Sequence, residues 1–174
     1  MNITATAPGL RKRFDLERKF ALIIDESSFG LKMTADICRD FGIGSIVSAK
    51  STESGFASLS ATPVDVVICD WGTLALDGPG LARRARASAE EHIKLVPIIL
   101  LKAQPTSSDV RAAREAGATE VLARPFSAQA LINHLTTIFF KPRGFVSTQT
   151  FNGPDRRRRS APEPALSRRK TDGA

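Results

Sequence analysis

The chain has 174 residues, a formal net charge of +7 and 42% hydrophobic residues, which is enough apolar material for one ordinary core. No apolar run approaches the roughly 20 residues that a membrane span needs, and residues 1–18 lack the hydrophobic region of a signal peptide. These observations exclude a membrane-spanning protein and favour a cytoplasmic one. Cys38 and Cys69 have no CxxC spacing, so we expect two buried, reduced core residues.

The positive charge is concentrated at the two ends of the chain. Residues 1–20 hold five basic and two acidic residues, residues 21–140 hold eleven and thirteen, and residues 141–174 hold nine and three. A mildly acidic body with a cationic tail suggests that the tail meets an anion. Residues 1–18 show no periodicity and predict a flexible arm. Residues 141–174 contain too few apolar residues for a core and predict a disordered, arginine-rich tail.

Short apolar runs and helical patterns alternate along the part of the chain between these ends. The apolar runs predict buried strands over residues 19–24, 43–49, 64–69, 96–101 and 120–123. Helical patterns follow them over residues 28–40, 51–60, 80–89, 107–116 and 128–140. In the first helix, Phe29, Met33, Ile37 and Phe41 are predicted to share one face. Strands alternating with crossover helices predict an α/β fold, a doubly wound five-stranded parallel sheet.

Carboxylates directly follow two of the predicted strands. Asp25 and Glu26 come after the first strand, and Asp70 stands where the third strand should end. In open α/β sheets the carboxyl ends of the strands border the crevice in which ligands bind. We therefore expect these acids to lie at a binding edge of the sheet.

The acids belong to a longer series of motifs that resembles a CheY-like receiver domain over residues 19–140. The series consists of Asp25-Glu26, Asp70, Asp77-Gly78, Pro97-Ile98-Ile99, Gly117-Ala118 and Arg124-Pro125-Phe126. The resemblance implies the strand order 2-1-3-4-5 and makes Asp70 the phosphoryl-accepting aspartate. It also implies a Mg²⁺ site formed by Asp25, Glu26, Asp70 and the backbone carbonyl of Gly72.

A metal ion at this edge makes chemical sense. Converging carboxylates repel one another, and a hard divalent cation with oxygen ligands relieves that repulsion and neutralises a transferred phosphoryl group. The alternative is that the carboxylates solvate the sheet edge and cap helices.

Several positions depart from the receiver pattern. Lys102 stands where receiver domains place a serine or threonine, Arg124 replaces a lysine, and Val121 replaces a residue that is often aromatic. Arg124 can pair with Asp70 or with a phosphate, and the ammonium of Lys102 can reach the acids. Such cations would weaken Mg²⁺ binding, which suggests a degenerate receiver with a weakened or locked phosphoryl switch. Alternatively, Lys102 points outward and Asp70 is still phosphorylated.

The tail contains a second motif, in which the sequence Asn-Gly-Pro-Asp precedes a run of arginines. It resembles the arginine-rich extension of a subgroup of CheY-like proteins that bind cyclic di-GMP. The resemblance implies that the ligand is bound by Asp155, Arg156, Arg157, Arg158, Arg159, Ser160, Arg168 and Arg169. Arginine matches the O6 and N7 acceptors of guanine, stacks on the base and pairs with phosphates, and aspartate accepts from the N1 and N2 donors.

The sequence therefore favours a non-enzymatic signalling protein that binds cyclic di-GMP through its tail and then engages a partner. Resemblance to the subgroup suggests the flagellar motor switch, reached through the face formed by residues 107–140. One rival is a conventional response regulator, switched when a histidine kinase phosphorylates Asp70. The other is a nucleic-acid-binding adaptor, which the shortage of aromatic residues among the arginines disfavours.

Overall fold

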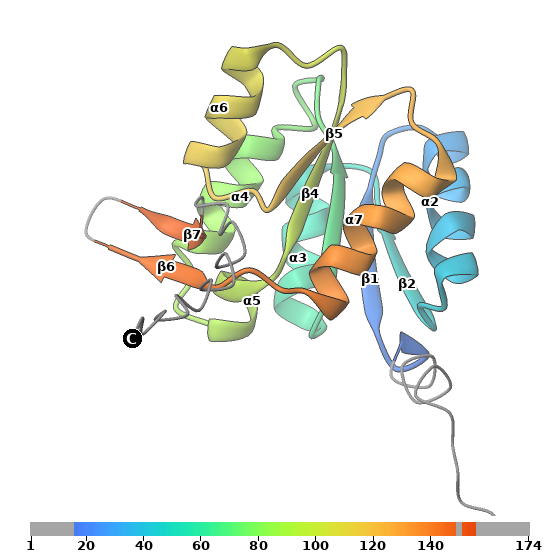
Figure 1. The fold of residues 1–174 in the computed structure, drawn as a ribbon, viewed down its shortest axis with the longest axis horizontal. Helices are drawn as coiled ribbons and strands as arrows, with labels where there is room; N and C mark the ends of the chain where they lie inside the picture. Colours follow the sequence, from blue (N-terminus) through green and yellow to red (C-terminus); the bar gives the residue numbers. More distant parts are fainter. Residues whose placement is uncertain (1–15, 149–150, 156–174) are drawn as a thin grey trace, which may run out of the picture.

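The computed structural model describes residues 16–148 and 151–155 and has a five-stranded parallel sheet at its centre (Figure 1). The strand order is β2-β1-β3-β4-β5, as predicted. The strands are β1 (Phe20–Ile24), β2 (Ser45–Ala49), β3 (Val66–Asp70), β4 (Ile98–Ala103) and β5 (Glu120–Arg124). Because β1, β3 and β4 are flanked by other strands and covered on both faces, their aliphatic side chains are almost wholly buried.

Helices cover both faces of the sheet and divide the core into two layers (Figure 1). They are α2 (Ser28–Phe41), α3 (Thr52–Ala61), α4 (Gly78–Arg86), α5 (Glu91–Leu95), α6 (Ser107–Glu115) and α7 (Ala128–Phe140). Helices α2 and α7 pack together on one face, and the side chains of α3, α4, α5 and α6 line the other. Each fully buried leucine or isoleucine contributes about 1.5–3 kcal/mol to this packing.

Side-chain caps fix where most of the helices begin. The hydroxyls or carboxylates of the N-cap residues accept hydrogen bonds from backbone amides in the first turns of α2, α3, α4, α6 and α7. Such caps are worth about 1 kcal/mol each. The short helix α5 is absent from the sequence prediction, and it places Ile93 in the core. No helix within the described ranges has the length and apolar character needed to cross a membrane.

Two details near the N-terminus correct the sequence prediction. Phe29 is 76% exposed and does not share the buried face of α2 with Ile37, because the buried face begins at Gly30 and Thr34 instead. The predicted arm is also too long. Leu16 is buried, and its carbonyl accepts hydrogen bonds from the amides of Lys19 and Gly44 at 2.9 and 3.2 Å. The remainder of the predicted arm, residues 1–15, lies outside the described residues.

The first part of the predicted disordered tail instead forms a hairpin. Strands β6 (Phe145–Ser147) and β7 (Asn152–Pro154) pair antiparallel beside α4, α5 and the lower end of α6 (Figure 1). The prediction is wrong here because the hairpin needs no core of its own: Gly153 is buried where it approaches Gly117, in the turn before β5. Residues 156–174, which carry the arginine run, lie outside the described residues, so their disorder stays a prediction.

Candidate functional site

The parallel register of the sheet brings three charged side chains to one edge. Asp25 follows β1, Asp70 ends β3 and Arg124 ends β5. Ile24 pairs with Cys69, which places the two aspartates beside each other at adjacent strand ends. Arg124 reaches the pair from the edge strand, across the end of β4. Of the three acids predicted to converge at this edge, Asp25 and Asp70 lie together on Arg124.

Arg124 bridges the two aspartates. Its Nη2 donates a hydrogen bond to Oδ2 of Asp25 at 2.7 Å, and its Nε lies 2.9 Å from Oδ1 of Asp70. The first contact is an aligned, charge-assisted hydrogen bond, whereas the second is an ion contact without hydrogen-bond alignment. Asp25 is therefore the firmer partner and Asp70 the looser one.

Asp25 is held from several sides. It is 3% exposed, and its Oδ1 accepts a hydrogen bond from the amide of Ser27 at 2.8 Å. A Cβ at Gly30 would overlap Oδ2 of Asp25, so only glycine lets α2 approach the carboxylate this closely. These contacts make Asp25 a fixed anchor for the Arg124 guanidinium.

Asp70 has a different environment from that of Asp25. Its side chain is 23% exposed, compared with 4% for Asp25. Burial raises the pKa of Asp70 because it disfavours the charged carboxylate; the Arg124 guanidinium opposes this shift, and the negative charge of Asp25 adds to it. The surroundings of Asp70 thus disfavour its ionised form.

The loop after β3 is tied to the start of α2 by a side-chain contact. The hydroxyl of Thr73 donates a hydrogen bond to Oε1 of Glu26 at 2.7 Å. Gly72, whose carbonyl is the implied metal ligand, lies in this loop between Trp71 and Thr73. Glu26 is consequently directed toward the loop and makes no contact with Arg124.

Lys102 does not join the acids. Its Nζ lies 4.5 Å from the centroid of the Trp71 ring, in a cation–π contact beside the pocket. The ammonium thus lies against an aromatic ring, and phosphorylation of Asp70, the other part of that alternative, stays a prediction. Val121, the predicted switch position, is half-buried and packs against the core layer under α3, α4 and α6. The positive charge inside the pocket therefore comes from Arg124.

The donor chemistry of the pocket fits Mg²⁺, since its ligands would be hard oxygens. In the structure, however, Arg124 already contacts one carboxylate oxygen of Asp25 and one of Asp70. Over the ranges 16–148 and 151–155, no three histidine, cysteine or acidic side chains are grouped as a metal site. Asp25, Glu26, Asp70 and Gly72 would hold the ion only after the guanidinium had moved.

Of the residues predicted to bind the ligand in the tail, the structure describes the first, Asp155. Asp155 directly follows β7, and its backbone amide donates a hydrogen bond to the carbonyl of Gly144 at 2.7 Å. The other predicted ligand-binding residues, namely Arg156, Arg157, Arg158, Arg159, Ser160, Arg168 and Arg169, lie outside the described residues.

A buried arginine at the opposite end of the sheet escaped the sequence analysis. Arg86 is 4% exposed, and its guanidinium donates hydrogen bonds to the backbone carbonyls of Gly117, Lys94 and Val96 at 3.0, 2.8 and 2.8 Å. Phe145 of the hairpin lies over it, with the ring centroid 5.6 Å away. A signal was present, because Arg86 follows the buried residue Ala82 at four-residue spacing in α4.

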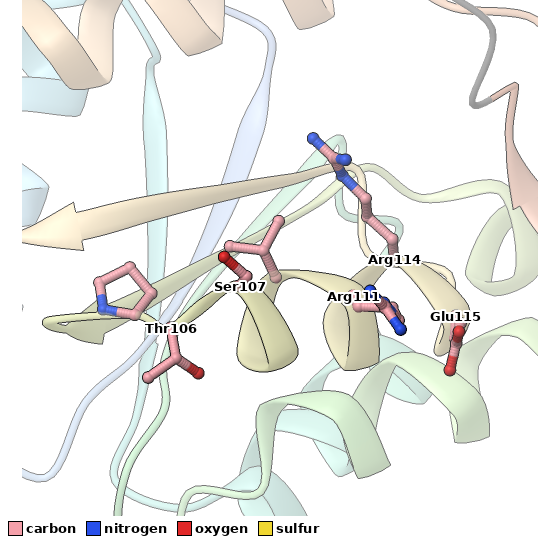
Figure 2. A pocket seen from close by; sticks show the side chains of 7 residues that line it. Thr106, Ser107, Arg111, Arg114 and Glu115 are labelled. Atoms are coloured by element: carbon pink, nitrogen blue, oxygen red, sulfur yellow. The ribbon is translucent and has the colours of Figure 1, made fainter.

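Helix α6 presents a polar surface that the sequence analysis also leaves unassigned. A shallow hollow of about 470 Å³ runs along it, between the loop that begins at Pro105 and the last turn (Figure 2). Arg111 and Arg114 line this hollow together with Glu115. In Figure 2 the two arginine side chains leave the helix in different directions.

Comparisons with known proteins agree with this geometry. The family model described as "Response regulator receiver domain" matches residues 21–136. The chain is 26% identical to the chemotaxis protein CheY of Pseudomonas aeruginosa, over 71% of this chain and 98% of that protein. It is also 26% identical to the chemotaxis protein CheY-3 of Vibrio cholerae, over 68% of this chain and 89% of that protein.

Solved structures share the fold. The chemotaxis response regulator CheY4 of Vibrio cholerae superposes with a TM-score of 0.62 at 23% identity, covering 69% of this chain and 98% of its own. The receiver domain of a sensor histidine kinase, PA1611 of Pseudomonas aeruginosa, gives a TM-score of 0.61 at 23% identity. That match covers 70% of this chain and 97% of the receiver domain, whose structure has a magnesium ion coordinated in the active site cleft.

Proposed function

Because this chain belongs to the family of response regulator receiver domains, we propose that it is a signalling protein whose phosphoryl switch is degenerate and whose input is cyclic di-GMP. The arginine-rich tail captures the dinucleotide, and the receiver presents the surface that a partner reads. The protein carries out no reaction of its own. Its sites serve binding.

The arginine bridge carries this proposal. Asp25 and Asp70, which would attract a divalent cation, already share the guanidinium of Arg124 at 2.7 and 2.9 Å. When bound, Mg²⁺ would neutralise the charge of a phosphoryl group on Asp70. Binding the ion requires the guanidinium to leave a buried carboxylate, and breaking such a pair costs about 3–5 kcal/mol if nothing replaces it. The internal cation therefore competes directly with the metal.

The position of Lys102 supports the same conclusion. In receiver domains that this chain resembles, a serine or threonine hydroxyl moves toward the phosphoryl group on activation. Lys102 has no hydroxyl, and its ammonium lies over the Trp71 ring rather than in the pocket. The step that would couple phosphorylation to the rest of the receiver lacks its usual side chain.

The hairpin supports the proposed role of the tail. It holds Asp155 near the start of β5 and the end of α6, and the arginine run directly follows Asp155 in the sequence. Arginine side chains offer a guanine O6/N7 fork, a stacking plane and a phosphate partner within one short segment. A segment that orders around a dinucleotide at this place can alter the exposed surface of α6, β5 and α7. We propose the flagellar motor switch as the partner that binds this surface.

Titration calorimetry with cyclic di-GMP tests the proposal on the whole protein. The matched variant replaces Arg156, Arg157, Arg158 and Arg159 by glutamine and leaves the hairpin intact. We expect saturable binding to the wild type and at least a hundredfold weaker binding to the variant, because several charge-assisted contacts are lost together. Equal binding by both proteins would refute the tail as the sensor. Tight, steeply salt-dependent binding of unrelated oligonucleotides would instead indicate the nucleic-acid adaptor.

A second candidate function rests on the exposure of Asp70 and on its weaker contact with Arg124. Its side chain is 23% exposed and its contact with Arg124 is unaligned, so a phosphodonor can approach it more easily than Asp25. In this alternative a histidine kinase phosphorylates Asp70, Arg124 then pairs with the phosphoryl group, and the tail is secondary. Substituting Asp70 by asparagine would then abolish signalling, whereas the tail variant would not.

A further inference from the structure

The hairpin forms a unit separate from the five-stranded sheet (Figure 1). Strands β6 and β7 pair with each other, and in the described structure neither joins the larger sheet. The amide of Thr148 donates a hydrogen bond to the carbonyl of Phe151 at 2.8 Å, and the amide of Asp155 donates one to the carbonyl of Gly144 at 2.7 Å. These bonds lie within the hairpin, so a movement of the whole hairpin would leave them intact.

The contact between the hairpin and the receiver buries little apolar surface. Gly153, which has no side chain, is the only residue of β6 and β7 that is buried, whereas Phe145 is half-buried. The ring centroid of Phe145 lies 5.6 Å from the guanidinium carbon of Arg86. The ion pair between Arg143 and Glu120 involves an arginine side chain that is 42% exposed, and exposed ion pairs contribute little to stability. The hairpin is therefore held less firmly than the helices that bury their aliphatic side chains against the sheet.

Unfilled space remains between the hairpin and the receiver. A cavity of about 330 Å³ lies between Asp155, the end of α6 and the start of β5. A second cavity of about 220 Å³ lies between Phe145 and an apolar patch of the receiver, which consists of Leu95, Pro97 and Ile138. Both volumes far exceed the roughly 10–15 Å³ that holds one water molecule, and tightly packed interiors contain few voids larger than that. Groups beside a void lack contact partners, so the hairpin does not interlock with the receiver.

The stem of the hairpin has the properties of a hinge. Residues 141–144 connect the end of α7 to β6, and a Cβ added at Gly144 would meet no atom within 4 Å. A glycine in open space can change its backbone angles without a steric clash. Helix α7 itself is anchored in the core by Leu131 and Leu135, which are fully buried. Rotation at the stem would consequently move the hairpin and leave the helix in place.

We propose that strands β6 and β7 form a strap that opens about this stem while the receiver stays folded, and that opening uncovers the apolar patch. In the closed state Phe145 lies over the patch and keeps other apolar groups away from it. Nη2 of Arg86 has no hydrogen-bond partner in the closed state, and water can supply one when the strap opens, which lowers the free energy of opening. The strap is an autoinhibitory contact, and this inference does not depend on which ligand the tail binds.

Thiol labelling of Ala118→Cys in the full chain tests whether the strap opens. Ala118 is 6% exposed and lines the larger cavity, which leaves room for a sulfur atom. The native Cys38 and Cys69 are buried in the core and serve as references within the same molecule, because they react only when the receiver unfolds. With excess maleimide, we expect the introduced thiol to react at least about a hundredfold faster than Cys38 and Cys69, as measured by peptide mass spectrometry.

Two further substitutions show whether movement of the strap limits the labelling. Phe145→Ala removes the ring that lies over Arg86, whereas Val146→Ala shortens the next side chain, which points to the opposite face of β6. We expect Phe145→Ala to raise the labelling rate of the introduced thiol about fivefold and Val146→Ala to raise it less than about twofold. An introduced thiol that reacts as slowly as Cys38 and Cys69 would overturn the strap, because the hairpin would then open only with the fold. Rapid labelling that Phe145→Ala leaves unchanged would overturn it as well, because the reagent would then reach the cavity without movement of the strap.

Discussion

Two arginines lie at opposite ends of the same sheet and are held in different ways. Arg124 contacts the carboxylates of Asp25 and Asp70, and its side chain is 24% exposed. Arg86 is 4% exposed and binds three backbone carbonyls, with no carboxylate among its hydrogen-bond partners in the described residues. Burial lowers the pKa of Arg86 to about 10, although the side chain stays charged at neutral pH.

The difference separates an exchangeable cation from a structural one. Carboxylates that hold Arg124 would also hold Mg²⁺, so another cation can take its place. The carbonyls that hold Arg86 belong to the end of α5, to the α5–β4 connection and to the turn before β5, and removing the guanidinium would leave them without these donors. The acid pocket is therefore the end that can be altered without loss of the fold, and the Arg86 end is where the hairpin is seated.

The largest effect is expected for Arg86→Met. Loss of three hydrogen bonds to buried or partly buried carbonyls should lower the free energy of unfolding by about 3 kcal/mol. Urea unfolding followed by circular dichroism measures this change. Arg83→Met is the control, since Arg83 is exposed on the same helix and should change stability by less than about 0.5 kcal/mol. Equal effects of the two substitutions would show that Arg86 does not hold this end together.

A smaller loss of folding stability is expected for Gly117→Ala, at the contact between the receiver and the hairpin. Gly117 has φ +92°, and an added Cβ would lie 2.7 Å from Cγ of Arg86 and 2.8 Å from the carbonyl oxygen of Asn152. We expect a destabilisation of about 2 kcal/mol and faster proteolysis within residues 144–155 as the hairpin is displaced. Gly144→Ala meets no atom within 4 Å and serves as the control. Unchanged proteolysis of the Gly117 variant would contradict the seating of the hairpin.

At the other arginine, the expected effect is on metal binding. Arg124→Gln removes the internal cation and should raise the affinity for Mg²⁺ about tenfold, because two carboxylates lose their competing partner. Trp71 is the only tryptophan of the chain and directly follows Asp70, so its fluorescence reports the titration. Arg39→Gln, which removes a surface ion pair with Asp36, should leave the affinity unchanged. If the two variants bind Mg²⁺ alike, Arg124 does not compete with the metal.

The smallest expected effect concerns Asp70 and has a definite pH dependence. Because its folded-state pKa is raised by burial, the folded protein binds the proton more tightly, and stability falls as pH rises from the ordinary aspartate pKa through the raised one. Asp70→Asn should remove this loss and raise the melting temperature at pH 7 by about 3 °C, and the gain should shrink at acid pH. Asp36 has a lowered pKa through its contacts with Lys32, so Asp36→Asn should not stabilise. A stabilisation by Asp70→Asn that does not vary with pH would argue against this cause.

The sequence predicts the sheet and its acid edge well, because both follow from local patterns. Aliphatic runs indicate the strands, and parallel register then brings the carboxylates that follow them together. Pairing of Arg124 with Asp70 is predicted too, but its firmer bond with Asp25 is not, since side-chain direction depends on the packed α2 around Gly30. Lys102 shows the same limit: its charge is evident from the sequence, and its contact with Trp71 is not.

The Arg86 end is harder to predict, because it depends on contacts between distant segments. In the sequence, Arg86 cannot be distinguished from the exposed arginines beside it in α4. Its burial depends on carbonyls from distant segments, such as that of Gly117 in the turn before β5. The hairpin strands have three residues each, too few for a periodicity to appear. Phe145 is stabilised by Arg86 of the receiver rather than by a core of the tail.

The account depends most on Arg124 closing the acid pocket, and one measurement tests this directly. Wild type and Arg124→Lys, which restores the residue that receiver domains carry there, are incubated with acetyl phosphate and Mg²⁺, and their intact masses are measured. Asp70→Ala gives the background. We expect the wild type to gain no phosphoryl group above that background and Arg124→Lys to gain one. A wild-type protein labelled on Asp70 as fully as the lysine variant would contradict the account and favour the phosphorylation-switched regulator.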